Sequence, residues 1–394
     1  MRCRRIKDTI KITILAVLCM VLVFLTGCWN NRDLTEINMV VAMGVDRSED
    51  DKVLVTVQVV EPAAIQSTAS GKGKGGGTQQ KPVFVESYKG ESVFDALSSM
   101  LSTVDKKLFL STAQVLILGE RLSKNGINEA LDFFQRDHEV QYKMDVLVAK
   151  GVTPKDILEI ENDIDSIPAV YIKKTAENTV LRAKVKRTML IDLIKDMGDN
   201  GKQPVIGQIT KAGEKKVRTE GAAVFRDGKL AGWLDQYATR GYLFATGEVK
   251  STTVNIPSDD GKISMEVIRS NGKVGVEFQN GKPALLTVKV ALEANVVEYE
   301  GFGRLSSPDK LHRLEEDLGG KIKEEITMAV NLAQKNYSSD IFGFGTQVHK
   351  YHPQYWKKAK VDWDDTFSKL PVEIKVDAKV RRTGDIKDPI KRDG

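Results

Sequence analysis

The segment Ala222–Trp233 reads AAVFRDGKLAGW and gives the most direct indication of the fold. Two apolar runs, Ala222–Arg226 and Leu230–Trp233, flank Asp227-Gly228-Lys229, and a short Asp-Gly loop between apolar runs is typical of a β-hairpin. Because a hairpin joins antiparallel strands, we expect at least part of the sheet structure to be antiparallel. This expectation argues against a protein built only from two doubly wound, parallel lobes.

A second hairpin is predicted further along the chain. The runs Lys262–Ile268 and Lys273–Phe278 flank Asn271-Gly272, a pair of residues that favours a tight turn. A following strand has one face toward water, because apolar residues alternate with polar or small ones at Leu286, Val288, Val290 and Leu292. The last predicted strand alternates in the same way, at Val372, Ile374, Val376, Ala378 and Val380.

A long helix is predicted between these last two strands. It begins at Ser307-Pro308, since serine caps helices and proline fits the first helical turn. Its buried stripe consists of apolar residues spaced three or four apart: Leu311, Leu314, Leu318, Ile322, Ile326 and Ala329.

Strands and helices also alternate in the first half of the chain. The predicted strands are Met39–Val45, Val53–Val60, Val115–Leu118 and the alternating residues Met144, Val146 and Val148. The predicted helices are one from Glu91 to Val104, Gly126–Asp137, one that begins at Thr153-Pro154, and Leu181–Met197. The fold class is therefore α+β, with mixed or antiparallel sheets packed with helices in two to three domains.

Composition shifts suggest where the domains begin and end. The chain has 394 residues, enough for two or three domains. The Gly-, Pro- and Lys-rich stretch Asp199–Lys216 places the main boundary between Val205 and Val217. The predicted division is a signal peptide at 1–27, an N-terminal α+β region at 28–205, a linker at 206–217 and a C-terminal α+β domain at 218–394. Within the N-terminal region, the glycine-rich segment 67–81 is expected to be a flexible loop.

The N-terminus has the pattern of a lipoprotein export signal. Five basic residues precede the apolar run Ile12–Leu25, and Leu25-Thr26-Gly27-Cys28 follows as a lipobox. Cleavage before Cys28 would leave its thiol to carry a diacylglyceryl group, and two acyl chains hold a protein durably at a membrane. The run of 14 apolar residues is shorter than the ~20 that a spanning helix needs.

Residues 1–27 also explain the charge of the chain. The whole sequence has 59 Lys+Arg and 54 Asp+Glu, a net charge of +5, and five of these basic residues lie in the export signal together with one acid, Asp8. The mature chain would therefore be nearly neutral. Its remaining basic clusters are short and lie among acids, so we expect no nucleic-acid partner.

The sequence contains no recognisable set of catalytic or metal-binding residues. His349 and His352 are close in sequence, but no acidic or cysteine ligand lies at a recognisable offset, so a packing or surface role is expected. Asp362, Asp364 and Asp365 could suggest a carboxylate pair, yet a solvated cap or turn is the simpler interpretation. We predict no catalytic residue, no metal ligand and no cofactor.

Several blocks of the sequence resemble the Ger(x)C family, the lipoprotein C subunits of spore germinant receptors. The similarity rests on Gly27–Ile37 (GCWNNRDLTEI), Met43–Asp46, Leu108–Glu120 (LFLSTAQVLILGE), Leu131–Asp137, Asp340–Gly345 (DIFGFG), Tyr351–Trp356, Trp363 and Arg381–Gly384. Asn30 stands where the family usually has aspartate, Ser111-Thr112 stands where a histidine is expected nearby, and the glycines at 71–77 look like an insertion.

The resemblance implies a non-enzymatic role in spore germination. It implies a lipid anchor at Cys28, a location on the outer face of the spore inner membrane, and assembly with the A and B subunits of a nutrient receptor. It also implies an α+β fold of about three domains, which would divide the N-terminal region in two. Direct contact with the small-molecule germinant is left open. The alternatives are a solute-binding lipoprotein that delivers a nutrient to a transporter and, less favoured, a cell-wall enzyme.

Overall fold

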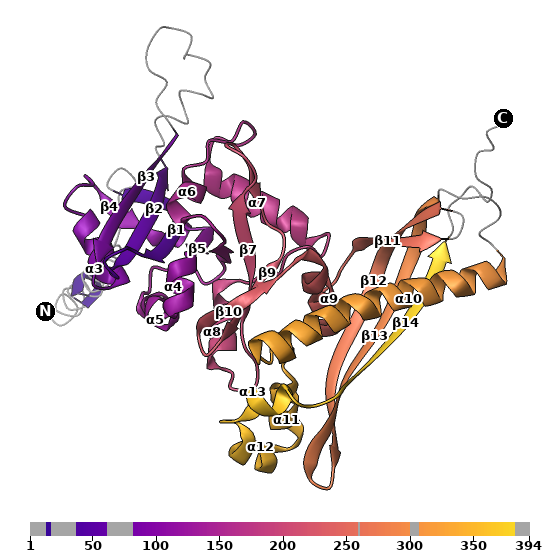
Figure 1. Ribbon diagram of the computed structural model, residues 1–394. Coiled ribbons are helices and arrows are strands. Elements are labelled where there is room, and N and C mark those ends of the chain that lie inside the picture. Colours follow the sequence, from indigo (N-terminus) through magenta and orange to yellow (C-terminus); the bar gives the residue numbers. More distant parts are fainter. Residues whose placement is uncertain (1–12, 17–36, 61–81, 259–260, 300–306, 383–394) are drawn as a thin grey trace, which may run out of the picture.

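The computed structural model describes residues 13–16, 37–60, 82–258, 261–299 and 307–382. These residues form two β-sheets with their helices, one toward each side of the view in Figure 1. Cys28, nearly all of the predicted signal peptide and the whole glycine-rich segment 67–81 lie outside the described residues. Within those residues, no helix is both long enough and apolar enough to cross a membrane.

The first sheet is mixed and has ten strands, with the main order β10-β9-β7-β6-β5-β1-β2-β3. Its centre is parallel, since β1, β5, β6 and β7 run in one direction, while both ends are antiparallel. The strands are β1 (Ile37–Arg47), β2 (Val53–Val60), β3 (Val83–Gly90), β4 (Lys107–Phe109), β5 (Val115–Leu118), β6 (Asp145–Ala149), β7 (Val205–Lys211), β8 (Val217–Arg218), β9 (Ala222–Arg226) and β10 (Lys229–Leu234).

Helices cover both faces of the first sheet. One face packs against α3 (Val93–Met100), α4 (Glu120–Asn125), α5 (Asn128–Arg136) and α8 (Leu190–Gly198), and the other against α6 (Pro154–Leu158) and α7 (Pro168–Val180). The short 3₁₀ turn η2 (Leu110–Thr112) leads into β5. Every residue of β5 and β6 is buried, as expected for parallel strands with helices on both sides.

The second sheet has four strands in the order β11-β12-β13-β14 and is covered by helices on one face. Its strands are β11 (Thr252–Ser258), β12 (Gly261–Gln279), β13 (Lys282–Tyr299) and β14 (Val372–Arg382), with β14 parallel to β13. The helices α9 (Gln236–Thr246) and α10 (Pro308–Asn331) form the covering layer, and α10 lies across the strands in Figure 1. A π-helical turn, η3 (Leu332–Tyr337), then leads to α11 (Phe344–Tyr351), α12 (Pro353–Ala359) and α13 (Trp363–Phe367).

The structure confirms the fold class and the hairpin that indicated it. Strands β9 and β10 pair antiparallel across Asp227-Gly228, where both residues have positive φ. The described part of the chain is α+β with two sheets packed with helices. The long helix begins as predicted at Pro308, and the strand over 372–380 is present as β14.

The turn predicted at Asn271-Gly272 is wrong. Strand β12 runs without a break from Gly261 to Gln279, and the hairpin closes instead at Asn280-Gly281. Gly272 has a different role, because a Cβ at this position would lie 1.9 Å from the carbonyl oxygen of Phe244 in α9. The glycine therefore permits close contact between helix and strand rather than a turn.

Two expectations around residue 200 also differ from the structure. Val205–Lys211, which covers the first half of the predicted linker, is the inner strand β7, paired with both β6 and β9. The helix predicted over Leu181–Met197 is confirmed only as α8, since residues 181–189 are not helical. Gly and Lys residues give the stretch 199–216 a polar composition, but Val205, Ile206 and Ile209 within it are buried.

Candidate functional site

The segment Ser338–Thr346 lies where the two sheets meet and carries the DIFGFG sequence. Asp340 is fully buried, and its carboxylate accepts five hydrogen bonds. One oxygen accepts from the backbone N–H groups of residues 342–344, at 2.9–3.2 Å. The other accepts from the N–H of Gly345 and from the indole Nε1 of Trp363, each at 2.7 Å. Asp340 therefore fixes the backbone of residues 342–345 and connects it to Trp363.

Burial raises the pKa of the Asp340 carboxyl group to about 6, against the opposing effect of the hydrogen bonds from Trp363 and the backbone. Asp364, on α13, accepts the backbone N–H of Asp340 at 2.9 Å and the side-chain amide of Gln203 at 2.8 Å. Burial also raises the pKa of Asp364. Gln203 completes the connection by donating its backbone N–H to the carbonyl of Asp340 at 2.8 Å.

The same segment is bonded directly to the first sheet. The hydroxyl of Ser339 donates to the carbonyl of Phe225 in β9 at 2.7 Å. The hydroxyl of Tyr337 donates to the carbonyl of Trp233 in β10 at 2.8 Å and accepts its N–H at 3.2 Å. A Cβ on Gly232 would lie 2.2 Å from the Tyr337 ring, so the strand needs glycine there. The DIFGFG region thus connects the two sheets.

A groove of about 910 Å³ lies beside this connection. Its walls come from the end of α8, the end of α9, the middle of β12 and the length of α11. The lining includes four lysines and three acids, namely Lys195, Lys202, Lys273, Lys350, Asp196, Asp199 and Glu248. Each of the three acids has a partner within the protein. Asp196 pairs with Lys202 at 2.9 Å, and Glu248 pairs with Lys186. Asp199 accepts a hydrogen bond from the hydroxyl of Thr346 at 2.9 Å.

A buried ion pair joins the two helices that cover the second sheet. Arg240 of α9 donates from Nε to the carboxylate of Glu325 of α10 at 2.8 Å, and a second bond joins Nη2 to the other oxygen. Arg240 also donates to the carbonyl of Thr253 at 2.8 Å, so its guanidinium reaches the edge strand β11. Glu325 has no exposed surface.

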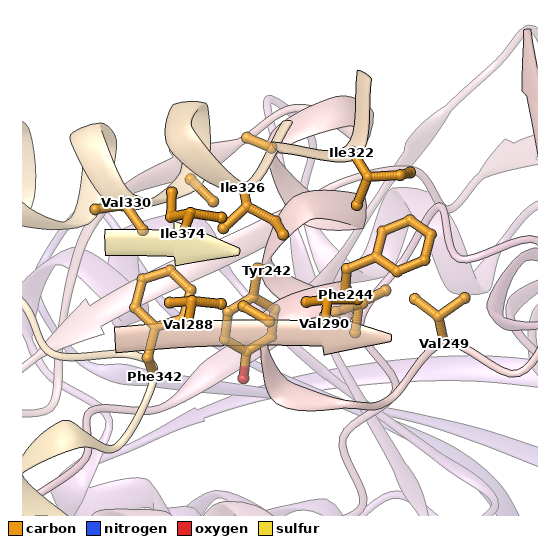
Figure 2. Close-up of a cluster of buried hydrophobic side chains, with 14 of the residues drawn as sticks. Tyr242, Phe244, Val249, Val288, Val290, Ile322, Ile326, Val330, Phe342 and Ile374 are labelled. Carbon is orange, nitrogen blue, oxygen red and sulfur yellow. The ribbon is translucent and has the colours of Figure 1, made fainter. Parts of the chain in front are cut away.

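Figure 2 shows the apolar cluster of which Tyr242 is the centre. Its ring lies among Val288, Val290 and Phe342, with the hydroxyl on the side away from Ile326 of α10. The hydroxyl is buried and has no hydrogen-bond partner among the described residues. Burial holds the pKa of this phenol well above its usual value.

The two histidines singled out in the sequence have packing roles, and of the three aspartates only Asp364 is partly buried. His352 stacks on Phe278 with ring centroids 3.7 Å apart, and His349 stacks on Trp356 at 5.8 Å. Asp364 is partly buried and bonded, unlike the solvated cap that we expected, while Asp362 precedes α13 without a side-chain capping bond. No group of three metal-ligating side chains occurs within the described ranges.

Comparison with known proteins identifies the family. The model "Spore germination protein N-terminal domain" matches residues 30–211, and "Spore germination B3/ GerAC like, C-terminal" matches residues 220–384. The chain belongs to the Ger(x)C family of spore germination proteins. It is 28% identical to spore germination protein KC of Bacillus subtilis, over 96% of this chain and 97% of that protein. It is 24% identical to spore germination protein B3 of the same organism, over 94% and 98%.

The fold of the family has a solved representative, the crystal structure of the GerBC protein. The structural alignment covers 86% of this chain and 96% of the GerBC chain, with a TM-score of 0.53 and 19% sequence identity. The similarity therefore concerns the fold. The gap between the two family models, 211 to 220, falls near the predicted boundary, yet β9 and β10 lie beyond the gap and belong to the first sheet. The region matched by the C-terminal model thus contributes two strands to the N-terminal sheet.

Sequence reasoning missed several residues of this site. Glu325 lies three residues after Ile322, so helical spacing already places it on the buried stripe of α10. In the sequence, Asp340 stands out only as part of the segment that resembles the family. An acid followed by Gly343 and Gly345 in an otherwise apolar run is a pattern that could have suggested a carboxylate bonded to backbone N–H groups.

Proposed function

We propose that this Ger(x)C protein is the lipid-anchored subunit of a nutrient germinant receptor. Cys28 would carry the lipid, and the folded chain would lie on the extracytoplasmic face of the spore inner membrane. The observation that carries the proposal is the lipobox at Cys28, placed shortly before the region 30–384 that the two family models match. A doubly acylated cysteine anchors a protein far more durably than a single chain does.

We further propose that the protein acts by assembling with the membrane subunits A and B rather than by catalysis. The bonding of three buried or partly buried acids supports this role. The carboxylates of Asp340 and Asp364 are bonded to backbone and side-chain donors of the protein itself, and Glu325 is bonded to Arg240. A tether at the membrane raises the effective concentration of the subunit, so weak contacts with partners suffice for a complex.

A solute-binding lipoprotein is the second candidate, and the groove of about 910 Å³ is the observation that favours it. Its volume lies within the range of small-molecule sites. Against it, the second sheet is built around the long antiparallel hairpin of β12 and β13, which is unlike a doubly wound lobe.

The anchor is tested by Cys28→Ala in spores. We expect the variant protein to leave the membrane fraction and germination with nutrients to be impaired. Cys19→Ala, in the discarded segment, is the matched control and should behave as the wild type. Normal membrane retention and germination in the Cys28 variant would refute the anchor.

The assembly role is tested separately by purifying a tagged chain from spore membranes in neutral detergent. We expect the A and B subunits to co-purify. Calorimetry with candidate nutrients on the same purified chain addresses the alternative, since tight binding of one nutrient without partner subunits would favour ligand capture.

A further inference from the structure

The face of the second sheet opposite α9 and α10 carries exposed, mostly charged side chains. On β13 this face presents Lys289 and Ala291, between the buried Val288, Val290 and Leu292. The same alternation gives β14 an outward row that includes Lys375 and Asp377.

Strand register aligns three lysines across this face. Lys273 of β12 pairs directly with Lys289 of β13, and Lys289 pairs directly with Lys375 of β14. Directly paired residues point to the same side of a sheet, and neighbouring strands lie about 4.8 Å apart. Three ammonium groups are therefore held in one row, which we call the lysine row. Like charges placed directly opposite each other on a sheet destabilise it.

Several other basic residues of this sheet have acidic partners. Glu293 binds Arg381 at 2.8 Å and lies 3.9 Å from Arg269. Lys379 pairs with Glu315 at 3.2 Å and lies 3.7 Å from Asp377. The charges in these neighbouring rows are thus compensated.

In the lysine row only Lys375 has an acidic partner, Glu373, at 3.0 Å. Within the described part of the chain, Lys273 and Lys289 form no ion pair and no side-chain hydrogen bond. The row borders a depression of about 340 Å³, lined by Asn271, Lys273, Lys289, Val290, Ala291, Lys375, Val376 and Asp377. The small side chain of Ala291 leaves this space open beside Lys289.

We propose that the lysine row binds a phosphate group. An ammonium group is a compact charge that binds a tetrahedral phosphate without a planar, paired geometry. One phosphate dianion between two lysines on adjacent strands offsets the repulsion between them. A soluble phosphate compound and a lipid headgroup both offer this chemistry. The site does not depend on the lipid anchor.

The test measures the thermal unfolding midpoint of the full-length protein in a neutral detergent. Inorganic phosphate is compared with sodium chloride and with sodium succinate at equal ionic strength. We expect phosphate to raise the midpoint above both, because a ligand of the folded state stabilises it. Equal midpoints in the three salts would overturn the proposal.

Lys289→Ala identifies the site. We expect at least a tenfold loss of phosphate affinity and, in phosphate-free buffer of low salt, a higher unfolding midpoint than wild type, since the central repulsive charge is gone. Lys358→Ala on α12 removes the same charge elsewhere. It should change neither the phosphate affinity nor the unfolding midpoint. Identical behaviour of the two variants would refute the site.

Dihexanoyl phosphatidic acid, used below its micelle-forming concentration, distinguishes the two sources of phosphate. Tighter binding than inorganic phosphate, lost in Lys289→Ala, supports the row as a headgroup site. Weaker or equal binding, also lost in Lys289→Ala, supports it as a site for a soluble phosphate compound. Binding that survives in Lys289→Ala contradicts the proposal.

Discussion

The two sheets bury their faces differently. Helices lie on both faces of the first sheet, so its central strands β5 and β6 are buried throughout. The second sheet is covered on one face, and its strands alternate between buried apolar residues and more exposed residues, many of them charged. The centre of the first sheet is therefore buried on both faces, whereas the second sheet has one face exposed to solvent.

The polar groups inside the two cores differ in the same way. In the first core, the neutral side chain of Gln58 donates to the carbonyl of Leu158 at 2.7 Å and accepts the N–H of Ala169 at 2.9 Å. It thereby holds α6 and α7 on the sheet. In the second core, the charged pair Arg240–Glu325 holds α9 to α10. A buried ion pair thus joins α9 to α10, whereas a neutral amide holds α6 and α7.

The largest expected effect breaks that ion pair. Glu325→Ala leaves the guanidinium of Arg240 buried without its partner, which costs about 3 to 5 kcal/mol. We expect the free energy of unfolding, measured in urea by circular dichroism, to fall by that amount. Gln58→Ala is the matched variant in the first core and should cost less, because only neutral groups lose their partners. Equal losses in the two variants would contradict the proposed contrast.

An intermediate effect tests the connection between the sheets. The folded protein holds the Asp340 proton up to about pH 6, while the unfolded chain releases it near its usual pKa of 3.8. Between these values the folded state binds more protons, so the contribution of Asp340 to stability falls as pH rises from about 4 to about 6 and is constant above. The difference corresponds to about 3 kcal/mol.

Asp340→Asn removes this pH dependence. Urea unfolding of both proteins between about pH 4 and about pH 7.5 should show the wild type losing stability relative to the variant across the lower half of the range. If the free energies of unfolding of wild type and variant differed by the same amount at every pH, Asp340 would not titrate in this window.

The smallest expected effect concerns Tyr242. Tyr242→Phe removes a buried hydroxyl without a described partner, so we expect stability to stay the same or rise by about 1 kcal/mol. Tyr337→Phe is the control, because its hydroxyl is bonded to Trp233, and it should lose about 1 kcal/mol. A clear loss of stability in the Tyr242 variant would indicate a bonded hydroxyl.

Much of the secondary structure was predictable because each strand pattern reflects its burial. The alternation at 286–292 and 372–380 predicted one-sided strands, and the run at 115–118 predicted a buried one. The turn prediction at Asn271-Gly272 was wrong because a glycine that permits a turn also permits close packing, here against the backbone of Phe244. Local sequence does not distinguish these two uses.

The site was predictable only in part. The segment 340–345 was noted through its similarity to a family, but its connection to residues 203 and 364 depends on contacts between distant parts of the chain. The linker over 206–217 was placed by composition, which carries no information on the pairing of β7 with β6 and β9. The lysine row likewise exists only through the register of three strands.

The parallel pairing of β14 with β13 has a consequence for the order of folding. Leu286 pairs with Val372, while α10, η3 and the three short helices lie between them in the chain. The β12–β13 hairpin and α10 can form early from local contacts, but β13 keeps one edge unpaired until β14 has been synthesised and returns to it. During that interval the edge is open to pairing with other chains, which makes this half of the molecule the slower to mature and the more exposed to misassembly.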